Sequence, residues 1–394
     1  MLKYGHILAD GWQWKKLSKI AQINPPPQKA EDESEVTFLG MADVSEAGKI
    51  INAQIRKFRE VSLGFTSFKG NDVLIAKITP CFENGKGCLA EGLKNNVGFG
   101  STEFHVLRPT PEVLPRYLHL LTVTHHFRGI GEIYMTGSAG QKRVPADFLR
   151  DYIIPLPPIA EQERIIDIIL SWSHAIEKTE KLIEAKRSWH VALANKLLSR
   201  KSSAVPLKKI LKLTLRDVAK PDKPYWALGI RSHGKGTFRR FIENPASVAM
   251  DTLYRVRHDD LIVNITFAWE GAIAFVDKAD EDCLVSHRFP TFEIDINKAL
   301  PAYLRHVIVQ KRFVRNLALI SPGGAGRNRV LNKTDFLNLK IALPEIKEQE
   351  KIGDVLNTSL REISLLEAKL ELLKKQKRGL MQKLLTGEWR VKVE

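Results

Sequence analysis

Side chains that could do chemistry are common in this chain, but their spacing matches no catalytic or metal-binding pattern. Residues 323–326 (GGAG) lack the Lys-Ser/Thr pair that follows the glycines of a phosphate-binding P-loop. None of the eleven histidines stands in an HExxH motif, and His125 and His126 are adjacent, so on a helix they would point apart. Cys81 and Cys88 have no second pair of ligands nearby, as a zinc site would require. We therefore expect no catalytic, metal-binding or cofactor-binding residue in this chain.

Residues 24–27 (NPPP) come closest to a catalytic motif. They carry the first three residues of the Asn/Asp-Pro-Pro-aromatic loop with which adenine-N6 methyltransferases hold a flipped base. The aromatic residue that would stack on the base is a proline here, and no glycine-rich cofactor loop accompanies it in the right context. The pattern predicts a rigid turn. A self-sufficient methyltransferase is therefore a rival hypothesis that lacks its own catalytic residues.

Loops rich in basic and amide side chains offer a different chemistry, the binding of double-stranded DNA. Arginine pairs with guanine, asparagine and glutamine pair with adenine, and lysine contacts the phosphates. In the first half of the chain, two loops place such side chains at exposed positions, and the candidate DNA-binding residues are Lys77, Thr79, Asn84, Lys86, Ser138, Gln141, Lys142 and Arg143.

The second half of the chain repeats this arrangement with different residues. A basic, glycine-containing stretch and two further loops supply the candidates Arg231, Lys235, Arg239, Arg240, Asn264, Thr266, Arg327, Asn328 and Arg329. For any one of these residues, a solvated surface charge is the alternative interpretation. Taken together, the loops favour contact with DNA.

An internal repeat positions these loops. Strand-like segments at residues 36–40 and 69–79 match residues 225–229 and 257–266, and residues 101–107 match residues 286–294. Helices opened by proline are expected at residues 114–121 and 300–308. The loop at residues 136–144 matches residues 321–330. The two halves are therefore copies of one plan, and between the matched segments their sequences differ almost completely.

Each copy ends in a long helix. Residues 157–170 (PPIAEQERIIDIIL) return as residues 344–357 (PEIKEQEKIGDVLN), and KLLS at 196–199 returns as KLLT at 383–386, always at an offset of 187 residues. In the second copy, apolar residues alternate at steps of three and four over about three heptads, interrupted by Lys377. The first copy has a more polar seam, and Leu182 and Trp189 widen its apolar stripe. Two such helices in one chain can bury their stripes against each other.

Composition narrows the choice of partner and compartment. The net charge of +16 over 394 residues favours a polyanionic partner, although a generally basic protein is the alternative interpretation. Three unrelated cysteines form no disulfide framework, so we expect a reducing compartment, the cytoplasm. No run of about eighteen apolar residues occurs, so we expect no membrane span.

The predicted fold class is α+β. Two globular mixed α/β domains stand in tandem repeat, separated by two long helices packed as an antiparallel coiled coil. The expected boundaries are residues 1–156 for the first globule, 157–200 for the first helix, 201–343 for the second globule, and 344–394 for the second helix and C-terminal tail.

The chain resembles the specificity (S) subunits of type I restriction-modification enzymes. The resemblance rests on the GW-x-W-x2-L opening at residues 11–17, on GNDVLIAKIT with GKG following, on the GQKR loop, and above all on the two EQ helix starts whose helices end KLLS and KLLTG. It implies two target-recognition domains, each binding one half of a split, asymmetric DNA sequence, with the two helices as the spacer between them.

The resemblance also implies the partners. Such subunits are not catalytic themselves; they bind two methyltransferase (M) subunits, which use S-adenosylmethionine, and restriction (R) subunits join that core. The specificity subunit of a type IIB-like enzyme is the nearest alternative, because it differs only in its partner. A protein–protein scaffold built on the coiled coil is a third hypothesis, but it leaves the basic loops unexplained.

Overall fold

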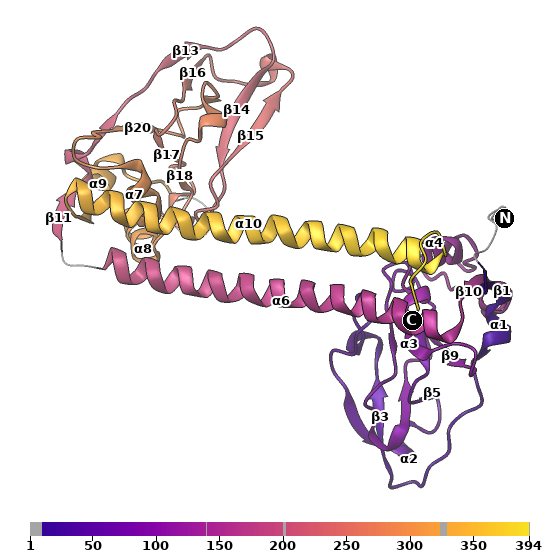
Figure 1. The fold of residues 1–394 in the computed structure, drawn as a ribbon. Helices are drawn as coiled ribbons and strands as arrows, with labels where there is room; N and C mark the ends of the chain where they lie inside the picture. Colours follow the sequence, from indigo (N-terminus) through magenta and orange to yellow (C-terminus); the bar gives the residue numbers. More distant parts are fainter. Residues whose placement is uncertain (1–9, 139, 200–201, 324–328, 394) are drawn as a thin grey trace. The chain divides into compact units, whose positions relative to one another are not determined.

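The computed structural model describes residues 10–138, 140–199, 202–323 and 329–393. Its chain divides into two compact units. Unit 1 comprises Met1–Thr179 and Lys369–Glu394, and unit 2 comprises Glu180–Ala368. Each unit contains a globule and one end of each of the two long helices, α6 (Ile159–Leu198) and α10 (Ile346–Leu385) (Figure 1). The predicted α+β tandem repeat with two long helices is confirmed.

The described part of unit 1 contains three sheets. Strands β1 (Gln13–Lys16) and β10 (Ile153–Leu156) form an antiparallel pair at the base of the globule. A four-stranded sheet has the order β2 (Ala21–Ile23), β9 (Phe104–Pro109), β6 (Val73–Ala76), β7 (Gly87–Leu89). A second has the order β4 (Gln54–Lys57), β3 (Glu35–Leu39), β8 (Val97–Gly100), β5 (Thr66–Lys69). In that sheet β3 and β8 are parallel.

Unit 2 repeats the plan. Strands β11 (Ser203–Pro206) and β21 (Lys340–Leu343) pair as β1 and β10 do. A four-stranded sheet has the order β12 (Leu211–Leu213), β20 (Thr291–Ile294), β17 (Leu261–Val263), β18 (Ile273–Phe275). The other has five strands, in the order β13 (Asp217–Ala219), β16 (Thr252–Arg255), β19 (Leu284–Val285), β14 (Tyr225–Ile230), β15 (Thr237–Ile242). Strand β13 has no counterpart among the described strands of unit 1.

Short helices close the cores. In unit 1 they are α1 (Leu17–Ile20), α2 (Phe58–Val61), α3 (Pro115–Thr122), α4 (His125–Ile133) and α5 (Ala146–Asp151); in unit 2 they are α7 (Pro301–Val307), α8 (Lys311–Leu319) and α9 (Lys333–Asn338). As predicted, α3 and α7 begin at a proline, whose missing N–H is not needed in the first turn. The largest fully buried side chains include Tyr117 of α3 and Tyr303 of α7.

A buried glutamine fixes the start of each long helix. The Gln162 side chain accepts a hydrogen bond from the backbone N–H of Leu114 (2.8 Å) and donates to the carbonyl oxygens of Glu112 and Pro157 (3.0 and 2.9 Å). Gln349 repeats all three bonds in unit 2, with Leu300, Lys298 and Pro344, at 2.9, 2.9 and 2.8 Å. Both glutamines are 0% exposed. In both units the glutamine of the EQ motif thus joins the start of the long helix to the loop before α3 or α7 by hydrogen bonds. We call this arrangement the glutamine bracket.

Within unit 2, α6 and α10 run antiparallel, because contacts that move forward along one helix move backward along the other. Lys186 forms an ion pair with Glu362 (2.7 Å), and His190 hydrogen-bonds Ser359 through Nδ1 (3.0 Å). These two polar residues of the first seam therefore find partners on the facing helix. Leu182 and Trp189 do not extend the stripe as predicted, since they are 44% and 51% exposed.

Within unit 1, the start of α6 lies beside the end of α10 and the C-terminal tail. Ile165 and Ile169 share a core with Leu384 and Leu385. The Glu161 carboxylate accepts a hydrogen bond from the Trp12 indole N–H (3.0 Å) and pairs with Arg390 in the tail. Both ends of the described chain are thereby fastened to the same helix start.

Candidate nucleic-acid interface

In unit 1, the structure brings the two predicted loops together. The backbone N–H of Thr79 donates to the carbonyl of Lys142 (2.9 Å), and the N–H of Val144 donates to the carbonyl of Lys77 (2.8 Å). The second loop also closes on itself, since Thr136 and Arg143 exchange backbone hydrogen bonds of 3.0 and 2.8 Å. The eight candidates of unit 1 therefore belong to one loop cluster at the end of β6.

Arg143 anchors this cluster. Its guanidinium makes a bidentate pair with the Glu103 carboxylate, with Nη2 2.8 Å from Oε1 and Nε 2.9 Å from Oε2. These hydrogen bonds lower the pKa of Glu103 and raise the pKa of Arg143. Ser138, Gln141 and Lys142 lie beside the pair and are exposed. Arg143 thus holds the loop in shape, while its three neighbours face solvent.

The first loop is more constrained. Lys86 donates from Nζ to the Met41 carbonyl (3.1 Å), and Thr79 hydrogen-bonds Glu83. Asn84 is exposed, and its amide donates to Glu46 (3.0 Å). Lys77 is partly buried. It lies close enough to Glu103 for its positive charge to contribute to the lowered pKa of the Glu103 carboxyl. A ligand at this loop would have to compete with these internal partners.

The NPPP segment bends at Asn24, and residues 25–27 have no regular secondary structure. The rigid turn stays a prediction. Asn24 has a positive φ of 50°, and its side-chain oxygen accepts from the Val106 N–H (3.0 Å). The Asn24 amide also lies 3.1 Å from Nδ1 of His105, whose Nε2 lies 2.9 Å from the Val144 carbonyl. Burial lowers the pKa of His105, which keeps the ring neutral in this chain of contacts. Through His105, Asn24 is therefore linked to Val144 at the end of the loop cluster.

Unit 2 assembles the corresponding loops from different side chains. The Leu331 N–H donates to the Ile265 carbonyl (2.8 Å), which joins the loop after β17 to the segment before α9. The Arg329 guanidinium lies over the Trp269 ring, 5.2 Å from its centroid. Asn264 accepts from the Thr266 N–H (3.1 Å), so these two candidates shape the loop. The candidates Arg327 and Asn328 lie outside the described residues.

The basic loop between β14 and β15 joins the same cluster. The N–H groups of His233 and Gly234 donate to the carbonyls of Glu270 and Gly271, at 2.8 and 3.0 Å. Lys235 is exposed at the tip, and Arg231 stacks on Phe238 with its guanidinium 5.1 Å from the ring centroid. Unit 1 has a loop in the corresponding place, because the β3–β4 connection supplies the Met41 carbonyl to Lys86 and the Glu46 carboxylate to Asn84. Three loops therefore lie together in each unit.

Arg239 and Arg240 differ in their surroundings although they are neighbours on β15. Arg239 pairs with Asp280 (3.2 Å), whereas no carboxylate among the described residues pairs with Arg240. The candidate residues chosen from the sequence omit the exposed aromatic side chains of this hairpin, Trp226, Phe238 and Phe241. The signal that could have found Phe238 and Phe241 is the FRRF run of β15, in which the two aromatic residues flank two arginines.

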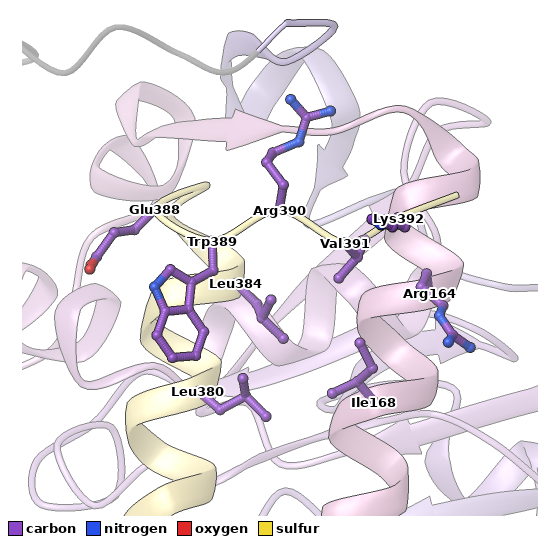
Figure 2. A pocket seen from close by; sticks show the side chains of 9 residues that line it. All are labelled: Arg164, Ile168, Leu380, Leu384, Glu388, Trp389, Arg390, Val391 and Lys392. Carbon is purple, nitrogen blue, oxygen red and sulfur yellow. The ribbon is translucent and has the colours of Figure 1, made fainter. Parts of the chain in front are cut away.

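A groove in unit 1 lies between the long helices and the tail. Figure 2 shows Ile168 of α6 pointing toward Leu380 and Leu384 of α10, Arg164 on the side of α6 away from α10, and the tail residues across the end. Its volume is about 510 Å³, and Trp389 at its edge is 51% exposed. The groove is lined by apolar side chains of both helices and by the charged side chains Arg164, Glu388, Arg390 and Lys392.

Other chemistry finds little support in the described part of the chain. No group of three or more His, Cys, Asp or Glu side chains there could hold a metal ion. Burial raises the pKa of the Cys88 thiol to about 12, so it is not a reactive thiolate at neutral pH. None of the described helices is long and apolar enough to cross a membrane.

Two copies of one α+β plan, each with clustered basic loops and a share of two paired helices, define a tandem-repeat protein with two different polar surfaces. The chain belongs to the type I restriction modification DNA specificity domain family, whose model matches residues 9–187 and 209–375. The resemblance inferred from the EQ helix starts is thus confirmed, and the family is that of type I systems.

Curated relatives agree with this assignment. The chain is 47% identical over 161 residues to the EcoAI specificity subunit of Escherichia coli, covering 40% of this chain and 27% of that protein. It is 41% identical over 194 residues to the EcoEI specificity subunit of the same species, covering 49% and 33%. The matches thus span a third or less of those two relatives. A MjaX specificity subunit of Methanocaldococcus jannaschii is 24% identical over 345 residues, covering 82% and 79%.

Solved structures share the fold. The HsdS subunit from Thermoanaerobacter tengcongensis matches with a TM-score of 0.58 and 15% identity, over 99% of this chain and 100% of that one. A chain from a structural study of complex assembly and conformational transition of the type I R-M system matches with a TM-score of 0.63 and 16% identity, over 98% and 100%.

Proposed function

We propose that this chain is the DNA-recognition subunit of a type I restriction-modification system and reads a bipartite, asymmetric target. The loop cluster of unit 1 contacts one half-site, and the loops around Trp269 and Lys235 in unit 2 contact the other. The observation that carries this proposal is the repeated backbone plan with unlike loop side chains. Phosphate contacts position such loops on DNA, and base contacts then specify the sequence.

The chain acts by binding and catalyses nothing itself. Two methyltransferase subunits bind it and use S-adenosylmethionine to methylate adenine, and restriction subunits join that core. The groove of unit 1 in Figure 2 is the place where we expect one methyltransferase subunit to contact α6, α10 and the tail. Each half-site alone supplies only about 1–3 kcal/mol per base pair read, so two joined half-sites are needed for a rare target.

Methylome sequencing tests the proposal directly. A strain that expresses the chain with its methyltransferase subunit should show adenine methylation in a split motif, and deleting the chain should abolish it. A strain that carries Gln141→Ala and Lys142→Ala, both exposed in unit 1, should relax one half of the motif and keep the other. Methylation that is unchanged by deletion of the chain would refute the proposed function.

A further inference from the structure

The β14–β15 hairpin of unit 2 presents two faces of different character. Strand residues alternate between faces, and the register pairs Ala227 with Arg240 and Gly229 with Phe238. The opposite face pairs Leu228 with Arg239, and Leu228 belongs to a buried cluster. The hairpin therefore uses one face for the core and has a second face formed around Ala227, Gly229, Phe238 and Arg240.

The small residues Ala227 and Gly229 leave a depression on this second face. A Cβ atom on Gly229 would lie 2.4 Å from the Phe238 ring, so the ring lies across the glycine. The surface next to it is a pocket of about 220 Å³, and Tyr225 and Arg240 contribute to its lining. Among the described residues that line the pocket, none is acidic. Most of the other lining residues are aliphatic, and Arg240 is the one charged residue among the described residues that line the pocket. The face thus combines an apolar hollow with aromatic side chains and one guanidinium.

The arginine side chains of this face indicate which kind of partner it can bind. Arg240 has no carboxylate partner among the described residues, whereas Arg239, next to it in sequence, is paired with Asp280. Arg231 adds a second guanidinium, stacked on Phe238. Four residues of strand separate Arg231 from Ala227, the partner of Arg240, which is about 13 Å at roughly 3.3 Å per residue. That is about four base-pair steps along a DNA duplex.

Unit 1 closes the equivalent surface. There β3 is the counterpart of β14, and Val36 and Phe38 are buried in a cluster with Val61 of α2. The cations beside that strand, Lys57 and Arg59, both pair with Glu33. On the same face, however, the Arg56 guanidinium lies 3.9 Å from the centroid of the Phe38 ring and donates to the Gln54 side chain (2.8 Å). Unit 1 therefore also carries a cation on this face, but it is stacked on a buried ring.

We infer that this face of the β14–β15 hairpin binds the sugar–phosphate backbone of duplex DNA beside the half-site that unit 2 reads. Arg240 and Arg231 contact phosphates, and Phe238 and Tyr225 pack on the deoxyribose rings between them. The inference rests on the proposed DNA-recognition function and extends it. It predicts that phosphate contacts at the half-site of unit 2 come from this hairpin face as well as from the loops.

Arg240→Ala and Arg239→Ala form a matched pair for the test, since they remove the same charge from adjacent positions. Each full-length variant is purified with its methyltransferase partner, and its affinity for the target duplex is measured over a range of salt concentrations. For Arg240→Ala we expect roughly tenfold weaker binding and a slope of log K against log salt that is shallower by about 0.9, with the base preference unchanged. For Arg239→Ala we expect a slope like that of the unmodified chain.

Phe238→Ala provides a second measurement, with an expected several-fold loss of affinity and an unchanged salt slope, because it removes packing and no charge. Equal effects of the two arginine substitutions, or none from Arg240→Ala, would overturn the inference. So would loss of the methyltransferase partner during purification, since the face would then bind protein. If the unmodified complex itself fails to bind the methylated motif, the proposed function fails instead.

Discussion

Replacing Gln162 with leucine should destabilise unit 1 by about 2–4 kcal/mol. Leucine has a similar volume but no polar atoms, so the change removes three hydrogen bonds and leaves the Leu114 N–H and the carbonyls of Glu112 and Pro157 without this partner. A hydrogen bond contributes about 0.5–1.5 kcal/mol net, and an orphaned buried group costs about 1–3 kcal/mol. Water can reach some of these partly buried groups, which places the expected loss below the sum of the orphan costs.

Hydrogen exchange read by mass spectrometry is the assay that separates the two units. Gln162→Leu should speed exchange around residues 112–118 and leave the matching segment of unit 2 slow, and Gln349→Leu should do the reverse. Urea denaturation supplies the magnitude. Gln376→Leu, at an exposed position of α10, is the control, because it removes a glutamine amide that lies outside the two EQ motifs.

An unfolding free energy for Gln162→Leu within about 0.5 kcal/mol of the Gln376→Leu value would refute this reasoning. Faster exchange spread equally over both units would refute it as well. Either result would mean that the buried hydrogen bonds of Gln162 are not what stabilises unit 1.

Two further predictions concern unit 1. Arg390→Ala should lower the free energy of unfolding by about 1–2 kcal/mol, because the Glu161 side chain, which is 7% exposed, would keep only the Trp12 donor. The loss is limited because the arginine side chain is itself 41% exposed. An unchanged denaturation midpoint would contradict this prediction. Burial lowers the pKa of His119 to about 4, against about 6.5 when unfolded, so the unfolded chain takes up the proton first. The resulting stability is present above pH 6.5 and is lost as the pH falls toward 4, by up to about 3 kcal/mol. His119→Leu should flatten that part of the stability profile, and an equally steep profile in the variant would show that other groups cause it.

The sequence predicts the repeat and the long helices well because these features are local and periodic. A gap-free offset of 187 residues between EQ motifs and between KLL motifs indicates rigid helices, and the structure has helices of 40 residues at both places. The same periodicity says less about which side chains contact the facing helix. It cannot tell that Lys186 and His190 face α10 while Leu182 and Trp189 face solvent, because polar seam positions become acceptable only when Glu362 and Ser359 lie opposite.

The candidate site shows the same division. Loop positions and their residue types can be read from the sequence, but the partners of individual side chains cannot. Arg143 lies 40 residues from Glu103, and Arg239 lies far from Asp280 in sequence, so no local pattern announces that both guanidinium groups are already paired. Arg240 carries the same charge one residue away and lacks such a pair among the described residues. Which arginine has a carboxylate partner is therefore decided by tertiary contacts.

The two units show how one backbone plan can carry two recognition surfaces. The buried glutamine bracket, the proline-opened helix and the backbone contact between loops recur in both units, and they depend on main-chain atoms or on buried side chains. The groups that differ, such as the Arg143–Glu103 pair and the Arg329–Trp269 stack, lie outside that framework. Because the framework is satisfied internally, loop side chains can change without loss of the fold. A bipartite target with unlike halves requires this separation of scaffold from surface.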